Sequence, residues 1–239
     1  MPLPQRISAV VFDVGNTLHH LDHAYIAATV EQHGFHAIAH AVAVAEYRAK
    51  AVVDEQFRAR AGGVDAGRRL SYFETLLEAL EVPRGVFASI TEALYAEDQR
   101  RSLWRVMHPD TPDVLAALRR RGFTLAVVSN ADGRVPAALA AGGIAEHFAA
   151  IVDSHLVGVE KPDARIFQIA LEACGTPAPA ALYVGDIFEI DIRGARNAEM
   201  TGVLLDPLGR YAPVDCPRIA TLGELLDLLP PSAGSPLPR

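Results

Sequence analysis

The feature of this sequence that most constrains its fold is a series of short, apolar, β-branched runs that end at small or polar residues. Such runs are typical of strands that are buried on both faces of a parallel sheet. The five predicted strands are Ile7–Phe12, Thr124–Val128, Ala149–Val152, Ala181–Val184 and Gly202–Leu205. From about residue 106 onward they alternate with predicted helices over Pro112–Arg121, Val135–Ala141, Ala164–Ala173, Ile190–Met200 and Leu222–Leu229. This alternation indicates a doubly wound sheet.

A purely helical segment separates the first two predicted strands. Its helical patterns cover His23–His33, Ile38–Val53, Ser71–Glu81 and Arg84–Ala96. We therefore predict an α/β fold, a doubly wound parallel Rossmann-like sheet with an inserted α-helical cap subdomain. Residues 1–18 and 106–230 are expected to form the core and residues 19–105 the cap. Residues 231–239 are rich in Pro, Ser and Gly, so we expect a disordered tail there.

Composition and charge exclude several classes of function. The net charge is −7 and there is no block of basic residues, which argues against a nucleic-acid surface. Cys174 and Cys216 form neither a metal-ligand set nor a disulfide framework, which fits a reducing compartment. No apolar stretch is long enough for a signal peptide or a membrane span. We expect a cytoplasmic protein that binds neither nucleic acid nor membrane, and the composition carries no prediction of oligomeric state.

Polar residues follow four of the predicted strands at the point where each strand ends. The segment Asp13–Thr17 follows the first strand and Ser129-Asn130 the second. Lys161 follows the third strand after a short loop, and Asp186 follows the fourth, with Asp191 five residues further on. In open α/β sheets the ligand crevice lies beyond the carboxyl ends of the strands. We therefore expect all four sets to converge on one site.

The chemistry of these groups is complementary. Two carboxylates at adjoining strand ends repel each other unless a cation lies between them, and oxygen ligands of this kind suit Mg²⁺. A hydroxyl, backbone amides and the ammonium of Lys161 are donors for anionic oxygens. A carboxylate can attack phosphorus to form an acyl phosphate, while the metal and Lys161 offset its repulsion from an incoming dianion. The residues thus predict a Mg²⁺-dependent hydrolase that uses Asp13 against a small phosphorylated substrate.

The same four segments resemble the motifs of the haloacid dehalogenase superfamily, in the subfamily with an α-helical cap. Val10–Leu18 resembles the first motif, Ser129-Asn130 the second, and Lys161–Asp163 the third. Gly185–Asp191, running into Gly194-Ala195, resembles the fourth. The likeness extends from residue 7 to about residue 206.

This resemblance implies a role for each candidate residue. Asp13 would be the nucleophile and Lys161 its catalytic partner. Mg²⁺ would be bound by Asp13, the backbone carbonyl of Gly15 and Asp186, with Asp191 supporting these ligands indirectly. The phosphoryl group would be bound by the Ser129 hydroxyl, the Asn130 amide and Lys161, and we add the Thr17 hydroxyl to this set.

One position departs from the family pattern. Phosphatases of this family usually carry a second Asp two residues after the nucleophile, as general acid and base, and here that position is Gly15. A backbone carbonyl needs no side chain, so the metal site can survive the change. Proton delivery to the leaving oxygen cannot, and general acid–base catalysis is typically worth about 10²–10⁴-fold.

Three functions are compatible with this departure. The one we favour is a phosphatase that is slow or uses another proton donor. His19 and His20 lie close enough in sequence to supply one, although we interpret them as solvated hinge histidines. The alternatives are a 2-haloacid dehalogenase, since halide leaves without a proton, and a phospho-ligand-binding protein without turnover. A dehalogenase has no use for a metal, whereas Asp186 and Asp191 keep the metal type of fourth motif.

Overall fold

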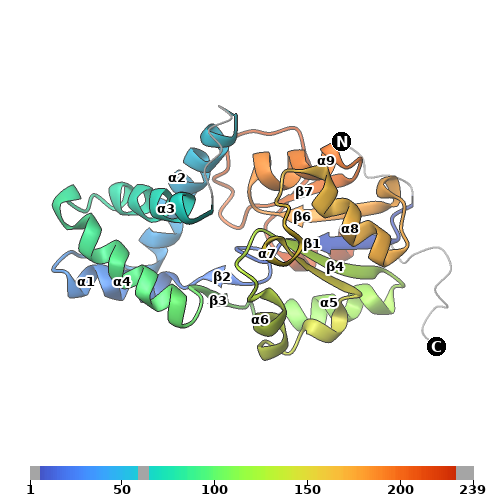
Figure 1. Ribbon diagram of the computed structural model, residues 1–239, viewed down its shortest axis with the longest axis horizontal. Coiled ribbons are helices and arrows are strands. Elements are labelled where there is room, and N and C mark those ends of the chain that lie inside the picture. The colour runs from blue at the N-terminus through green and yellow to red at the C-terminus, as the bar shows by residue number, and fades with distance from the viewer. Residues whose placement is uncertain (1–5, 59–64, 230–239) are drawn as a thin grey trace. The chain divides into compact units, whose positions relative to one another are not determined.

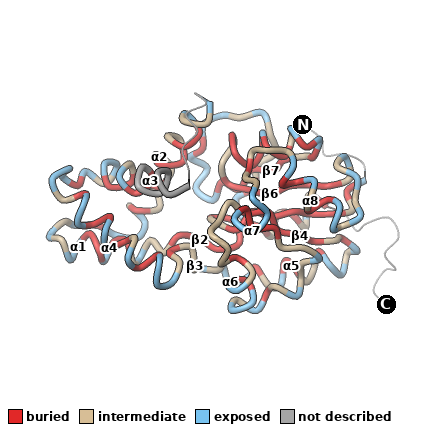
Figure 2. The backbone as a smooth tube through the Cα atoms, in the orientation of Figure 1, coloured by how far each residue is buried: buried red, intermediate tan, exposed pale blue. Residues whose placement is uncertain are grey.

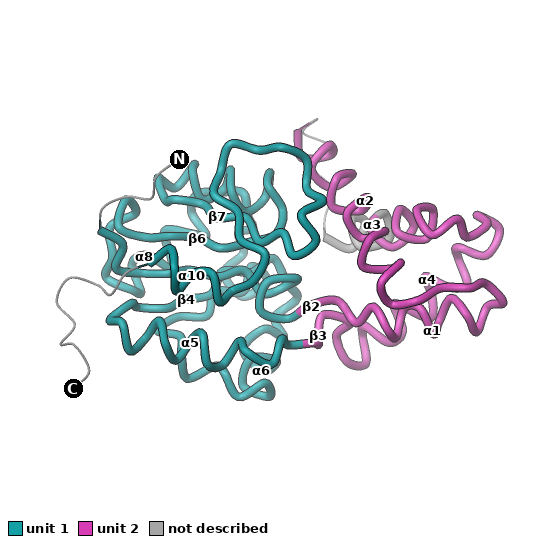
Figure 3. The backbone as a smooth tube through the Cα atoms, turned by 180° about the vertical axis from the view of Figure 1, so that it is seen from behind, with its two compact units in different colours: residues 1–19, 107–239 teal, residues 20–106 magenta. Residues whose placement is uncertain are grey.

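The chain forms two compact units, seen here in a computed structural model that describes residues 6–58 and 65–229, with the backbone alone for residues 65–71. One unit runs up to His19 and continues from Met107 onward, and the other runs from His20 to Val106 (Figure 3). The role of the second unit as a cap stays a prediction. The predicted tail, residues 231–239, lies outside the described residues.

A six-stranded parallel sheet forms the first unit, in the order β5-β4-β1-β6-β7-β8 (Figure 1). The chain starts at the centre, adds two strands on one side, and then returns to add three on the other. This order confirms the predicted doubly wound sheet. Strand β8 was not predicted, because two residues are too few for a periodic pattern. In sheet order the strands are Ala150–Asp153, Thr124–Ser129, Ala9–Phe12, Ala181–Gly185, Thr201–Leu205 and Arg218–Ile219.

Helices cover both faces of this sheet. Side chains of α5, α6 and α10 pack on one face and those of α8 and α9 on the other. The strands between them are buried along most of their length (Figure 2). In β1, Val10 and Phe12 face α5, α6 and α10, whereas Ala9 and Val11 face α8 and α9. Because successive side chains of a strand point to opposite faces of the sheet, Asp13 is directed to the side of α8 and α9. These helices are α5 Thr111–Arg120, α6 Val135–Ala141, α10 Leu225–Leu228, α8 Ala164–Cys174 and α9 Arg193–Asn197.

Short helical turns make up the remaining elements of the first unit. They are η2 Ala145–His147, α7 Ser154–Val157, η3 Ala178–Ala180, η4 Phe188–Ile192 and η5 Leu222–Glu224. The predicted helix over Ile190–Met200 is divided into η4, a single π-helical turn, and α9. In η4, Asp191 Oδ2 accepts hydrogen bonds from the backbone N–H groups of Asp186 (3.0 Å) and Ile187 (2.9 Å). This turn therefore directs a buried carboxylate at the loop that follows β6, which a regular helix pattern does not predict.

The second unit is helical apart from a short antiparallel ribbon. Its helices are α1 His23–Gln32, α2 Ala39–Arg58, α3 Asp65–Ala79, η1 Arg84–Val86 and α4 Phe87–Arg100. Strands β2 His20–Leu21 and β3 Trp104–Val106 pair where the chain enters and leaves the unit. Helix α3 begins six residues earlier than predicted, and the ribbon was too short to predict. Within residues 6–58 and 65–229, no helix combines the length and apolar character needed to cross a bilayer.

Candidate active site

Three carboxylates meet at the carboxyl edge of the sheet. Asp13 directly follows β1 and Asp186 directly follows the neighbouring strand β6. One oxygen from each of Asp13, Asp186 and Asp191 lies within 4.8 Å of the others. All three side chains are buried. The structure thus brings together the carboxylates that the strand-end pattern placed at one edge.

Lys161 supplies a positive charge to this cluster. Its Nζ lies 2.6 Å from Asp13 Oδ1 and 2.7 Å from Asp191 Oδ1, and it also donates to the Tyr183 hydroxyl at 2.9 Å. The lysine side chain is only 3% exposed. One ammonium cannot balance three carboxylates, so the cluster favours a further cation.

The charges of the cluster perturb one another strongly. Burial raises the pKa of Asp13 to about 7; Lys161 opposes this rise, and Asp191 and Asp186 add to it. Burial alone would lower the pKa of Lys161, but Asp13 and Asp191 outweigh it and hold that pKa above the usual range. Lys161 is therefore charged at neutral pH, while Asp13 is only partly ionised without a metal. A cation beside Asp13 would favour the ionised form.

Gly185 creates the space for Asp191. A Cβ on Gly185 would lie 2.5 Å from Asp191 Cβ and 2.6 Å from its Oδ2, closer than such atoms can approach. The Asp191 carboxylate is held on one oxygen by Lys161 and on the other by backbone amides. Because its bonds to the protein use both oxygens, Asp191 is suited to orient its neighbours, whereas Asp13 and Asp186 are the better candidates for direct metal ligands.

Asn130 contacts the loop that carries Lys161. Its Oδ1 accepts from the backbone N–H of Lys161 (2.7 Å), and its Nδ2 donates to the Lys161 carbonyl (2.9 Å). This pair of bonds fixes the backbone from which the Lys161 side chain projects. Ser129, at the end of β4, is buried at the same edge of the sheet. The side chain of Asn130 is thus engaged by the protein, and its predicted contact with phosphate would come from its backbone amide.

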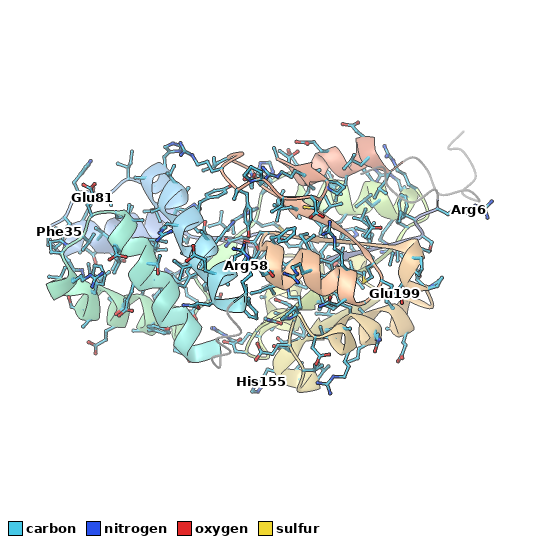
Figure 4. All side chains as sticks on the ribbon, turned by 90° about the horizontal axis from the view of Figure 1, so that it is seen from above. Arg6, Phe35, Arg58, Glu81, His155 and Glu199 are labelled. Atoms are coloured by element: carbon cyan, nitrogen blue, oxygen red, sulfur yellow. The ribbon has the colours of Figure 1, made fainter. Side chains whose placement is uncertain are left out.

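Asp153, which was not among the predicted site residues, fixes the loop after Ser129-Asn130. Asp153 ends β5 and is fully buried. Its carboxylate accepts from the backbone N–H groups of Gly133 (3.0 Å), Val135 (3.3 Å) and His155 (3.0 Å), while the His155 side chain lies exposed (Figure 4). An acidic residue directly after an apolar run was the available signal, the same one that marked Asp13.

The loop after β1 holds two further candidates, Thr17 and His19. Thr17 is fully buried, and among the described residues its Oγ1 has no hydrogen-bond partner. A buried hydroxyl of this kind suits a ligand oxygen. The interpretation of His19 as solvated is wrong: the residue is 5% exposed, and its Nε2 lies 3.3 Å from the position of a Cβ on Gly142, at the end of α6. Burial also lowers the pKa of His19, which favours the neutral ring over the protonated form that a general acid requires.

Known proteins resemble this chain in sequence and in structure. The sequence family described as haloacid dehalogenase-like hydrolase matches residues 7–199. The human haloacid dehalogenase-like hydrolase domain-containing protein 3 is 36% identical over 149 residues, which cover 60% of this chain and 58% of the relative. A phosphoserine phosphatase of Thermus thermophilus is 36% identical over 140 residues, 58% of this chain and 54% of the relative. The matches thus span little more than half the length of these relatives.

A solved structure extends the likeness to nearly the whole chain. The structure of YfnB from Bacillus subtilis, described as a HAD (haloacid dehalogenase) hydrolase bound to magnesium, superposes on this chain with a TM-score of 0.66 at 20% identity. The superposition covers 94% of this chain and 99% of that one. At this identity the likeness establishes the fold alone.

Proposed function

This chain belongs to the haloacid dehalogenase-like hydrolase family and is a hydrolase, and from that premise we propose that it is a Mg²⁺-dependent phosphatase. Its substrate is a small phosphorylated metabolite, and its intermediate is an aspartyl phosphate on Asp13. One observation carries the proposal: a buried cluster in which the oxygens of Asp13, Asp186 and Asp191 lie within 4.8 Å of one another and Lys161 bonds two of the three. The phosphatase named among the relatives supports the same reaction class.

The donor set of the cluster fits Mg²⁺. Carboxylate and carbonyl oxygens are the ligands that this ion prefers, and it usually keeps several waters. Asp13, Asp186 and the Gly15 carbonyl would hold it, and Asp191 would orient the loop that carries Asp186. When bound, the ion supplies positive charge that stabilises the ionised Asp13 and the phosphoryl oxygens.

Each residue of the chain then has a defined task. An oxygen of Asp13 attacks phosphorus, a new P–O bond forms, and the bond to the leaving oxygen breaks. Lys161 keeps its charge beside the Asp191 carboxylate, 2.7 Å from its Nζ, and offsets the charge of the phosphoryl oxygens rather than protonating the leaving group. The hydroxyls of Thr17 and Ser129 and the Asn130 amide would bind the phosphoryl oxygens. Water then attacks the acyl phosphate, which releases inorganic phosphate and restores the Asp13 carboxylate.

The glycine at position 15 determines which phosphate esters are hydrolysed fastest. It has no side chain to protonate the departing oxygen, and His19 is packed against α6 with a lowered pKa. A leaving group that is stable as an anion needs no such proton. We therefore expect aryl phosphates to turn over faster than alkyl phosphates, by part of the about 10²–10⁴-fold that a general acid is typically worth.

A panel of phosphate esters tests the proposal. Wild-type protein with Mg²⁺ is expected to release inorganic phosphate, and EDTA or Asp13→Asn should lower the rate by about 10³-fold or more. Acid quenching during turnover should trap a phosphorylated Asp13, which peptide mass spectrometry locates. Undiminished turnover in Asp13→Asn would remove the nucleophile assignment.

Gly15 also favours a second candidate, dehalogenation, because halide leaves without a proton. Incubation with a short 2-haloacid in EDTA separates the two functions. Halide release that needs no metal, with no phosphatase activity, would establish the dehalogenase. Affinity for a phosphorylated ligand with no turnover in either assay would instead identify a binding protein.

A further inference from the structure

The ammonium of Lys161 has a third hydrogen-bond partner that the proposed chemistry does not use. An ammonium carries three N–H donors. Two of them point to carboxylates, at Asp13 Oδ1 (2.6 Å) and Asp191 Oδ1 (2.7 Å), and the third points to Tyr183 Oη at 2.9 Å. The three partners together account for every donor of a side chain that is almost fully buried.

Tyr183 is itself held rigidly. It lies on β6 opposite Val11 of β1 and is fully buried. Its ring packs edge-on against Phe167, with 5.0 Å between ring centroids. The hydroxyl has two acceptors in reach, the Val128 carbonyl at 2.9 Å and Asp191 Oδ1 at 3.4 Å. The shorter distance assigns the phenolic hydrogen to Val128. The lone pairs of Tyr183 Oη are then left for the ammonium of Lys161.

We propose that Tyr183 is a positioning residue, which holds Lys161 Nζ at the point from which it bonds both Asp13 and Asp191. This inference rests on the proposed function for its catalytic meaning. When Asp13 becomes an acyl phosphate it loses its charge, and with it much of its attraction for the ammonium. Tyr183 is neutral and anchored to Val128, so its bond to Lys161 does not depend on the state of Asp13. The ammonium therefore stays in place for the phosphoryl oxygens.

The lysine content of the chain makes this contact directly observable. Lys50 and Lys161 are the only lysines in the sequence. Protein labelled with ¹⁵N-lysine should therefore give two side-chain ammonium signals, assigned by Lys161→Met. In the wild type, the Lys161 signal should be protected from exchange with water. In Tyr183→Phe it should shift and exchange faster, while the Lys50 signal stays in place as an internal reference.

A matched control replaces another buried tyrosine. Tyr72, in the helical unit, donates to Glu46 Oε1 at 2.6 Å. Tyr72→Phe makes the same chemical change and should leave the Lys161 signal unmoved. An unshifted Lys161 signal in folded Tyr183→Phe, or an unprotected one in the wild type, would overturn the inference. The wild-type measurement decides this even where the variant does not fold.

Kinetics separate positioning from general damage to the core. Tyr183→Phe should lower kcat/KM by about tenfold to a hundredfold, the usual range for losing a hydrogen bond to a charged group. In a Lys161→Met background the same change should cost less than about twofold, because there is no ammonium left to hold. An equal loss in both backgrounds would mean that Tyr183 acts through packing, against the inference. Absence of turnover in the wild type would count against the proposed function, and the ammonium signal would then decide the Tyr183 contact alone.

Discussion

Replacing Asp13, the proposed nucleophile, should stabilise the metal-free protein. Asp13 is a buried carboxylate beside Asp186 and Asp191, and its pKa in the folded chain is raised from 3.8 to about 7. The folded state therefore disfavours the charge of Asp13 in spite of Lys161. Asp13→Asn places a neutral group of nearly the same shape in the same position, so it removes that penalty.

The magnitude follows from the raised pKa. Between pH 3.8 and about 7 the folded protein keeps a proton on Asp13 that the unfolded chain has lost. Stability accordingly falls as the pH rises through this window and stays at its lower level above about pH 7. About three pH units at 1.36 kcal/mol each set an upper bound of about 4 kcal/mol. Relaxation and water penetration reduce this, and we expect a gain of about 2–4 kcal/mol for Asp13→Asn at pH 8.

Urea denaturation in EDTA, followed by circular dichroism at pH 4 and at pH 8, measures this gain. At pH 4 wild type and Asp13→Asn should unfold at nearly the same urea concentration, and at pH 8 the variant should be more resistant. If Mg²⁺ binds as proposed, a saturating concentration should shrink the difference, because the ion would stabilise the folded wild type with Asp13 ionised.

Asp153→Asn is the matched control, a buried aspartate of the same unit with the opposite expectation. Its two carboxylate oxygens accept three backbone N–H groups, whereas an asparagine amide keeps one accepting oxygen and replaces the other with an NH₂ group that cannot accept. This variant should be less stable at pH 8 by about 1–3 kcal/mol. A gain for Asp13→Asn that is the same at both pH values, or a loss at pH 8, would refute the electrostatic reasoning.

Three further substitutions probe the geometry of the site. Gly185→Ala should displace Asp191, since the new Cβ would lie 2.6 Å from its Oδ2. Mg²⁺ affinity, measured by calorimetry, and turnover should both fall by about tenfold or more, and wild-type values would mean that η4 can adjust. Gly15→Asp should raise turnover of alkyl phosphates more than that of aryl phosphates, and an equal gain for both would show that proton delivery is not the missing element. Asn130→Ala removes two hydrogen bonds to the Lys161 backbone, so it should lower the free energy of unfolding by about 1–3 kcal/mol and should also lower kcat. An unchanged free energy of unfolding and an unchanged kcat would contradict the role of Asn130 in holding that loop.

Much of the site was predictable because it depends on local pattern and sheet topology. An apolar run that stops at Asp13 or before Asp186 marks a strand end, and parallel strand ends share one edge. Those two facts are enough to bring Asp13 and Asp186 together, and Lys161 and Asp191 join the prediction because each follows a strand end by a short segment. The same periodicity separates the sheet-forming segments from the helical insertion.

Only the tertiary structure decided which side chains hold that site in place. The Tyr183 hydroxyl accepts from Lys161 Nζ, and the Asn130 side chain forms two hydrogen bonds with the Lys161 backbone. The His19 ring lies beside Gly142 at the end of α6. These contacts join residues that are far apart in the sequence; His19 and Gly142, for example, are separated by 123 positions. The direction of a side chain where two such elements meet depends on how both elements pack. The sequence pattern at a strand end predicts that a residue lies at the carboxyl edge of the sheet. Its hydrogen-bond partners depend on the shape and charge of all the groups packed around it.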